Sequence, residues 1–119
     1  MPRIRTIKPT LWSDDSFADL SRDARLLLIG LISMADDAGR FVASTASVAG
    51  YVFPHDELPP ATIKKWLGEI EKHMARTVQF YDIDGRRYGW FRNFTSKHQR
   101  INRPQPSSLP PCPGEETLL

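Results

Sequence analysis

The sequence is short of the residues that build disulfides, membrane spans and secretory signals. It has a single cysteine, Cys112, which excludes an internal disulfide and a metal site made of several thiolates from one chain. The longest apolar run, residues 26–32, is interrupted by Gly30 and is far shorter than the roughly 20 residues of a membrane-spanning helix. Residues 1–5 carry charge, but the apolar stretch of a secretory signal does not follow them. We therefore expect a cytoplasmic protein without a membrane segment.

Arrangements typical of catalysis are also scarce. His55, His73 and His98 are scattered, and none has a second potential ligand at metal-binding spacing. Glycine-rich loops of the kind that cradle phosphates are absent. Asp36 and Asp37 form a tempting carboxylate pair, but a glycine follows closely, and aspartates in that position commonly bond to the backbone of a turn. The sequence predicts no enzyme activity, no metal and no cofactor.

The charges that are present lie in blocks. A hydrophobic content of 40% and a charged content of 25% indicate an ordinary globular domain, and the net charge of +2 says little about partners. From residue 86 to residue 103, however, there are six Lys or Arg residues and no Asp or Glu. Arg3, Arg5 and Lys8 form a second basic block, and both blocks flank a more acidic middle. This distribution favours an anionic partner.

Capping residues and apolar spacing predict the helices. Ser21 and Ser44 are good N-caps, and Pro59-Pro60 suits the first turn of a further helix. The expected elements are an extended arm over 3–12, a short helix capped by Ser13 and ending at Leu20, a helix over 22–36 closed by a left-handed Gly39, a strand over 40–42, a helix over 45–52, and a helix from 59 with the buried stripe Ile63, Trp66, Leu67, Ile70 and Met74. The helix over 22–36 is apolar on nearly all sides, which indicates either a central core helix or a face used for dimerisation.

The run after residue 76 predicts a β-hairpin. Two β-prone stretches, 77–83 and 86–94, are separated by Asp84-Gly85, a strong two-residue turn signal. The resulting register pairs Tyr81 with Tyr88. One face carries Val78, Phe80 and Phe91 toward the core, and the other carries Tyr81, Tyr88 and Trp90 beside Arg86 and Arg92. Aromatic side chains among arginines suit base stacking and phosphate contact, but they equally stabilise a hairpin or cover a neighbouring arm.

Helix, strand, helix, helix and hairpin follow one another in the order of a winged helix-turn-helix. We therefore expect an α+β fold, mostly α, with three main helices and a two-stranded β-wing. Residues 1–95 would form this domain, including the N-terminal arm. Residues 96–119 would be a basic strap followed by a proline-rich, extended tail.

This order predicts where nucleic acid would bind. The second helix of a helix-turn-helix enters the major groove, and wings and flexible arms contact phosphates beside it. The candidate residues are Thr62, Lys64, Lys65, Lys72 and Arg76 on or just after the helix from 59; Arg86, Arg87 and Arg92 on the wing; and Lys97, His98, Arg100 and Arg103 in the strap. Glu69 and Glu71 on the same helix would repel phosphate, and a merely solvated helix face would show the same pattern.

Several short motifs also carry a resemblance. They are Arg3-Ile-Arg-Thr-Ile-Lys-Pro, Leu20-Ser with Ala24-Arg-Leu-Leu, Ala35-Asp-Asp-Ala-Gly-Arg40, Phe53-Pro54, and Lys97-His-Gln-Arg-Ile-Asn-Arg-Pro104. In this order, over about residues 3–108, they resemble the N-terminal winged-helix modules of phage and prophage replication proteins, the replisome-organiser and DnaD-like initiators.

The resemblance implies binding to an origin or to single-stranded DNA in a bacterial host cell. It also implies recruitment of replication partners such as a helicase or its loader. Three alternatives remain open at this point: a role in gene control, an oligomerisation or protein-interaction module that uses the same fold without DNA contact, and an inhibitor directed at a host protein.

Overall fold

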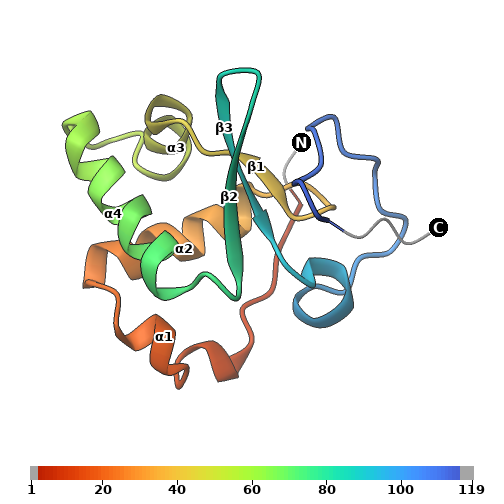
Figure 1. Ribbon diagram of the computed structural model, residues 1–119. Coiled ribbons are helices and arrows are strands. Elements are labelled where there is room, and N and C mark those ends of the chain that lie inside the picture. Colours follow the sequence, from red (N-terminus) through yellow and green to blue (C-terminus); the bar gives the residue numbers. More distant parts are fainter. Residues whose placement is uncertain (1–2, 116–119) are drawn as a thin grey trace.

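A central helix organises the hydrophobic core. The computed structural model describes residues 3–115, and in it α2 (Arg22–Met34) contacts both α3 (Thr45–Val52) and α4 (Pro60–His73) (Figure 1). The hydroxyl of Ser21 accepts a hydrogen bond from the amide of Ala24 and caps α2, as predicted. The fully buried residues of α2 are Ala24, Leu27, Leu28 and Leu31. The interpretation of this segment as a core helix is therefore confirmed.

α2 ends earlier than the sequence predicted. The helix stops at Met34, and Ala35 is already extended, with a ψ of 144°. The carboxylate of Asp36 accepts hydrogen bonds from the amides of Ala38 and Arg40, both at 3.0 Å, and so competes with continuation of the helix. Gly39 has the expected left-handed backbone, with a φ of 84°, but it belongs to this turn and does not cap the helix.

The β-elements form one antiparallel sheet. β1 (Arg40–Val42), β2 (Val78–Ile83) and β3 (Arg86–Phe91) lie in the order β1-β3-β2. Asp84 and Gly85 both have positive φ, as a two-residue hairpin turn of this hand requires, and Tyr81 lies opposite Tyr88 as predicted. The expected two-stranded wing was incomplete, because β1 pairs with β3 and adds a third strand.

The smaller elements differ in detail from the prediction. α1 (Asp15–Ala18) is capped by Asp14, whose carboxylate accepts from the amides of Ser16 and Phe17, so the expected Ser13 cap was wrong. The N-terminal arm (residues 3–12) includes a 3-10 turn, η1 (Pro9–Leu11). β3 ends at Phe91, earlier than the β-prone stretch to residue 94 predicted, and the chain then forms a π-helical turn, η2 (Phe94–His98).

Both faces of the sheet are covered. Phe41, Val78 and Phe91 are buried against the helices, with Phe80 half-buried beside them. On the other face, Tyr81 and Tyr88 stack with ring centroids 5.6 Å apart and are only 6% and 7% exposed.

The proline-rich tail (residues 104–115) covers those tyrosines. Cys112 and Leu109 pack against them, and the Tyr81 hydroxyl donates a hydrogen bond to the carbonyl of Pro110 at 2.7 Å. Burial raises the pKa of Tyr81 to about 12. Of the two interpretations that the sequence left open, the structural one therefore holds for Tyr81 and Tyr88, which stack on each other and hold the tail.

The described residues thus form an α+β fold with more helix than strand, and no helix among them is long and apolar enough to cross a membrane. The predicted buried stripe of α4 is confirmed for Ile63, Leu67, Ile70 and Met74. Trp66 lies at the edge of that stripe. It is half-buried, and its ring is 5.5 Å from that of Phe53.

Candidate nucleic-acid interface

α4 exposes most of the cations that the sequence singled out. Lys64, Lys65 and Lys72 are exposed on the helix, and Arg76 is exposed three residues after its end. Thr62 is half-buried near the N-terminus of α4. Because Ile63, Leu67 and Ile70 turn inward, helical spacing places the lysines away from the core. This side of α4 is a solvent-facing basic surface.

The acidic residues of α4 are engaged within the protein. Glu69 accepts hydrogen bonds from the backbone amide and the hydroxyl of Ser21, at 2.9 and 2.8 Å, and so ties α4 to the start of α2. Burial acts to raise the pKa of Glu69, but the two bonds from Ser21 and the nearby charges of Lys65 and His73 hold it below its usual value. Glu71 pairs with Arg87 at 2.7 Å. The expected repulsion of phosphate by these two carboxylates is therefore reduced.

The two arginines next to the hairpin turn differ. Arg87 pairs with Glu71 and with Asp82, at 2.7 and 3.1 Å, and its guanidinium lies over the ring of Phe80. It holds the hairpin against α4. Arg86 is exposed on the opposite face of the sheet, and within residues 3–115 its side chain forms no hydrogen bond or ion pair. Arg86 is the cation at the hairpin tip that remains available.

Arg92 lies at the base of the hairpin, at the end remote from the tip. Its side chain donates a hydrogen bond to Gln79, and its guanidinium lies 5.9 Å from the ring centre of Trp90. Its Nε atom is buried without a hydrogen-bond partner among the described residues. Arg92 is thus half-buried beside Trp90 and is less accessible than the lysines of α4.

The basic strap, Lys97–Arg103, is ordered on the body of the protein. Its Gln99 is buried, and the side-chain amide accepts a hydrogen bond from the backbone N–H of Thr6 and donates one to the carbonyl of the same residue. Ile101 packs against the core. The residues Lys97, Arg100 and Arg103 are exposed.

His98 is the half-buried member of the strap. Burial, together with the positive charges of Lys8 and Lys97, lowers the pKa of its imidazole below the usual value.

A cluster that the sequence did not reveal joins the N-terminal arm to the proline-rich tail. We call it the terminal clasp: Arg3, Arg5, Asp37 and Gln105. The Asp37 carboxylate accepts hydrogen bonds from Arg5 at 3.0 Å and from the amide of Gln105 at 2.8 Å, and it forms an ion pair with Arg3 at 3.2 Å. Arg5 also donates to the carbonyl of Ala35 at 2.8 Å. Although burial acts to raise the pKa of Asp37, these donors lower it below its usual value. Two charges of the N-terminal basic block are therefore used internally.

The candidate residues do not form one surface. The lysines of α4 lie on one side of the hairpin, with Arg86 at its tip, whereas η2 and the strap lie at its base (Figure 1). Three of the motifs that carried the resemblance do meet, since the arm, the Asp36-Asp37 turn and the strap are joined through the clasp and through Gln99. One signal in the sequence points to the clasp: a turn of this kind needs one aspartate. Because Asp36 alone accepts the hydrogen bonds of the turn amides, Asp37 has no role within the turn.

Comparison with known proteins adds no relative. Family models, curated proteins and solved structures were compared with the chain, and none matched.

Proposed function

We propose that this chain is a DNA-binding module of the winged helix-turn-helix type, related to those of phage replication initiators and acting in replication initiation or gene control. The order α2, β1, α3, α4 and β-hairpin supports it, because this is the order of a helix-turn-helix with an appended wing. In that arrangement α3 and α4 form the pair, and α4 is the helix that enters the major groove.

The exposed cations of α4 are the observation that carries this proposal. Lys64 and Lys65 follow the first turn of the helix, near the end with which recognition helices contact bases. The fold uses Glu69 and Glu71 but leaves these lysines in solvent, while Arg86 adds a separate positive charge at the hairpin tip, on the other face of the sheet. The phosphates of DNA attract such positive charges over long distances, so the exposed lysines are also expected to increase the rate at which the protein associates with DNA.

Reversing one charge on α4 tests this surface. Lys64→Glu is expected to weaken binding to duplex DNA about tenfold or more near physiological salt and to lower the slope of log K against log salt by about one unit. The measurement is fluorescence anisotropy with a labelled duplex across a salt series from 50 mM.

Arg22→Glu is the matched control for that variant. Arg22 is equally exposed, but it lies on α2, in the first turn, between the exposed Asp19 and Asp23, and is not one of the cations that α4 carries. Equal losses in the two variants would mean that only net charge matters. If the unmodified protein does not bind duplex or single-stranded DNA at 50 mM salt, the proposed function is wrong.

The strap is proposed as a second contact to phosphates flanking the main site. Lys97→Gln combined with Arg100→Gln is expected to lower the salt slope by about two units while leaving the melting temperature unchanged, because both side chains are exposed. Truncation after Ser96 is unsuitable, since it also removes the packing of Gln99 and Ile101 and is expected to destabilise the fold. An unchanged salt slope in the double variant would restrict the strap to a structural role.

Two exposed hydrophobic side chains favour the alternative of a protein-interaction or oligomerisation module. Leu26 on α2 is 53% exposed and Tyr51 on α3 is 38% exposed. Sedimentation velocity separates the two functions, because a concentration-dependent dimer without DNA binding favours the alternative. A second test is the capture of partners from a bacterial lysate with and without nuclease. Replication partners recruited through DNA are lost after nuclease treatment, whereas partners bound directly are retained, including a host protein that the chain inhibits.

A further inference from the structure

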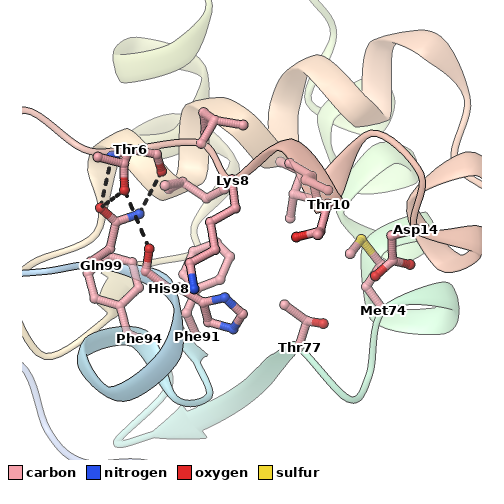
Figure 2. A pocket seen from close by; sticks show the side chains of 14 residues that line it. Thr6, Lys8, Thr10, Asp14, Met74, Thr77, Phe91, Phe94, His98 and Gln99 are labelled. Atoms are coloured by element: carbon pink, nitrogen blue, oxygen red, sulfur yellow. Dashed lines mark hydrogen bonds between the residues drawn. The ribbon is translucent and has the colours of Figure 1, made fainter.

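A cavity of about 160 Å³ lies between the N-terminal arm and the hydrophobic core (Figure 2). Its floor consists of core side chains: Leu28, Ile32, Met74, Phe91 and Phe94. Ile7 and Leu11 of the arm complete the apolar lining. The cavity is therefore continuous with the core and separate from the exposed surface of α4.

Natural cores contain few voids larger than a water molecule, because unfilled apolar space costs stability. An apolar cavity of about 150 Å³ accommodates a molecule the size of benzene. The space beneath the arm has this size and a mainly apolar lining, so it fits a single aromatic ring or a branched aliphatic group.

Positive charge marks one end of the opening. The Lys8 side chain extends toward the imidazole of His98, and both line the cavity (Figure 2). Lys97 lies close enough to influence His98 but does not line the cavity. Asp14 is the acidic residue of the lining, and its carboxylate is occupied by the amides of Ser16 and Phe17.

Lys8 and His98 lie side by side at the cavity (Figure 2), and within residues 3–115 neither forms an ion pair with a carboxylate. A carboxylate there would accept charge-assisted hydrogen bonds from both groups. It would also favour the protonated imidazole, because a nearby negative charge raises the pKa of a histidine.

We propose that this cavity is a binding site for a small aromatic or branched aliphatic carboxylate, whose apolar part fills the space over Met74 and Phe94 and whose carboxylate lies between Lys8 and His98. Such a ligand would contact the arm and the core together, so its binding stabilises the arm in the position that it has here. The site is distinct from the proposed DNA contact of α4, while His98 belongs both to this site and to the strap.

Three probes of similar size or charge test the site by NMR titration. Benzoate is expected to shift the methyl resonances of Leu28, Ile32 and Met74 and to bind at least about tenfold more tightly than benzyl alcohol, which lacks the charge, and than acetate, which lacks the ring. In the same titration the pKa of His98 should rise with benzoate and stay constant with benzyl alcohol.

Lys8→Met is expected to remove the preference for benzoate over benzyl alcohol, and Lys97→Met is the matched control that should retain it. Lys8 is exposed, so neither variant is expected to disturb folding. Absence of methyl shifts with benzoate overturns the site itself. Equal binding of benzoate and benzyl alcohol, or equal behaviour of the two variants, overturns the assignment of a carboxylate ligand.

Discussion

Asp37→Ala is expected to lower the free energy of unfolding by about 3 kcal/mol. The side chains of Asp37 and Arg5 are only 4% and 5% exposed, so the substitution leaves the Arg5 guanidinium buried without its counter-charge. The Gln105 amide also loses its acceptor, which loosens the attachment of the tail. The Arg3 side chain is 37% exposed and can turn to solvent when Asp37 is removed. The expected loss of unfolding free energy is therefore at the lower end of the range for breaking a buried ion pair.

Urea denaturation followed by circular dichroism measures this effect, with two variants for comparison. Asp37→Asn retains an acceptor for the Gln105 amide but removes the charge, so an intermediate loss is expected. Glu57→Ala removes an exposed carboxylate from the loop before α4 and should change stability by less than about 0.5 kcal/mol. If Asp37→Ala unfolds at the same urea concentration as Glu57→Ala, the clasp does not contribute to stability.

The dependence of stability on pH gives a second measurement of the clasp. Because the pKa of Asp37 is lower in the folded state than its ordinary value of 3.8, the folded state binds fewer protons than the unfolded state at acidic pH. The stabilisation by Asp37 is therefore complete well above pH 4 and is lost as the pH falls through the folded-state pKa. Asp37→Asn should flatten the acidic part of the plot of unfolding free energy against pH. The lowered pKa of Glu69 leaves part of the pH dependence in this variant, with the same sign.

Local signals in the sequence were sufficient for most of the secondary structure. Ser21 and Ser44 cap the helices that they were expected to cap, and the Asp84-Gly85 turn sets the register of the hairpin. Each of these features depends on hydrogen bonds within a few residues, so composition and spacing predict them. The exposed lysines of α4 were predicted for the same reason, because helical periodicity alone places them opposite the buried stripe.

The contacts that the sequence did not predict connect distant segments. Arg3 donates to the carbonyl of Asn102, 99 residues away, and Asp37 binds both the N-terminal arm and the proline-rich tail. Periodicity carries no information about such pairs. The same limit explains why Arg87 was expected to be free at the wing, since its partner Glu71 lies on α4. A basic residue can therefore be found from sequence, but whether its charge is available depends on tertiary pairing.

Gly89→Ala is expected to lower the free energy of unfolding by about 3 kcal/mol, because β3 has no room for a side chain at this position. A Cβ atom on Gly89 would lie 2.1 Å from the Cζ atom of Phe41 and 2.5 Å from Cε2. Phe41 is 1% exposed and cannot retreat, since its ring packs against those of Phe80 and Phe91 at 6.1 and 5.5 Å between centroids. Either the sheet or the aromatic cluster must shift.

The same substitution elsewhere supplies a control of opposite sign. Gly68 lies within α4, where a new Cβ meets nothing within 4 Å, so Gly68→Ala should raise stability by about 0.5–1 kcal/mol through helix propensity. Phe41→Leu should be less destabilising in the Gly89→Ala background than alone, because the smaller side chain makes room for the methyl group, and the double-mutant cycle measures that coupling. Thermal melting that is unchanged in Gly89→Ala would show that the Phe41 ring does not pack against Gly89 of β3.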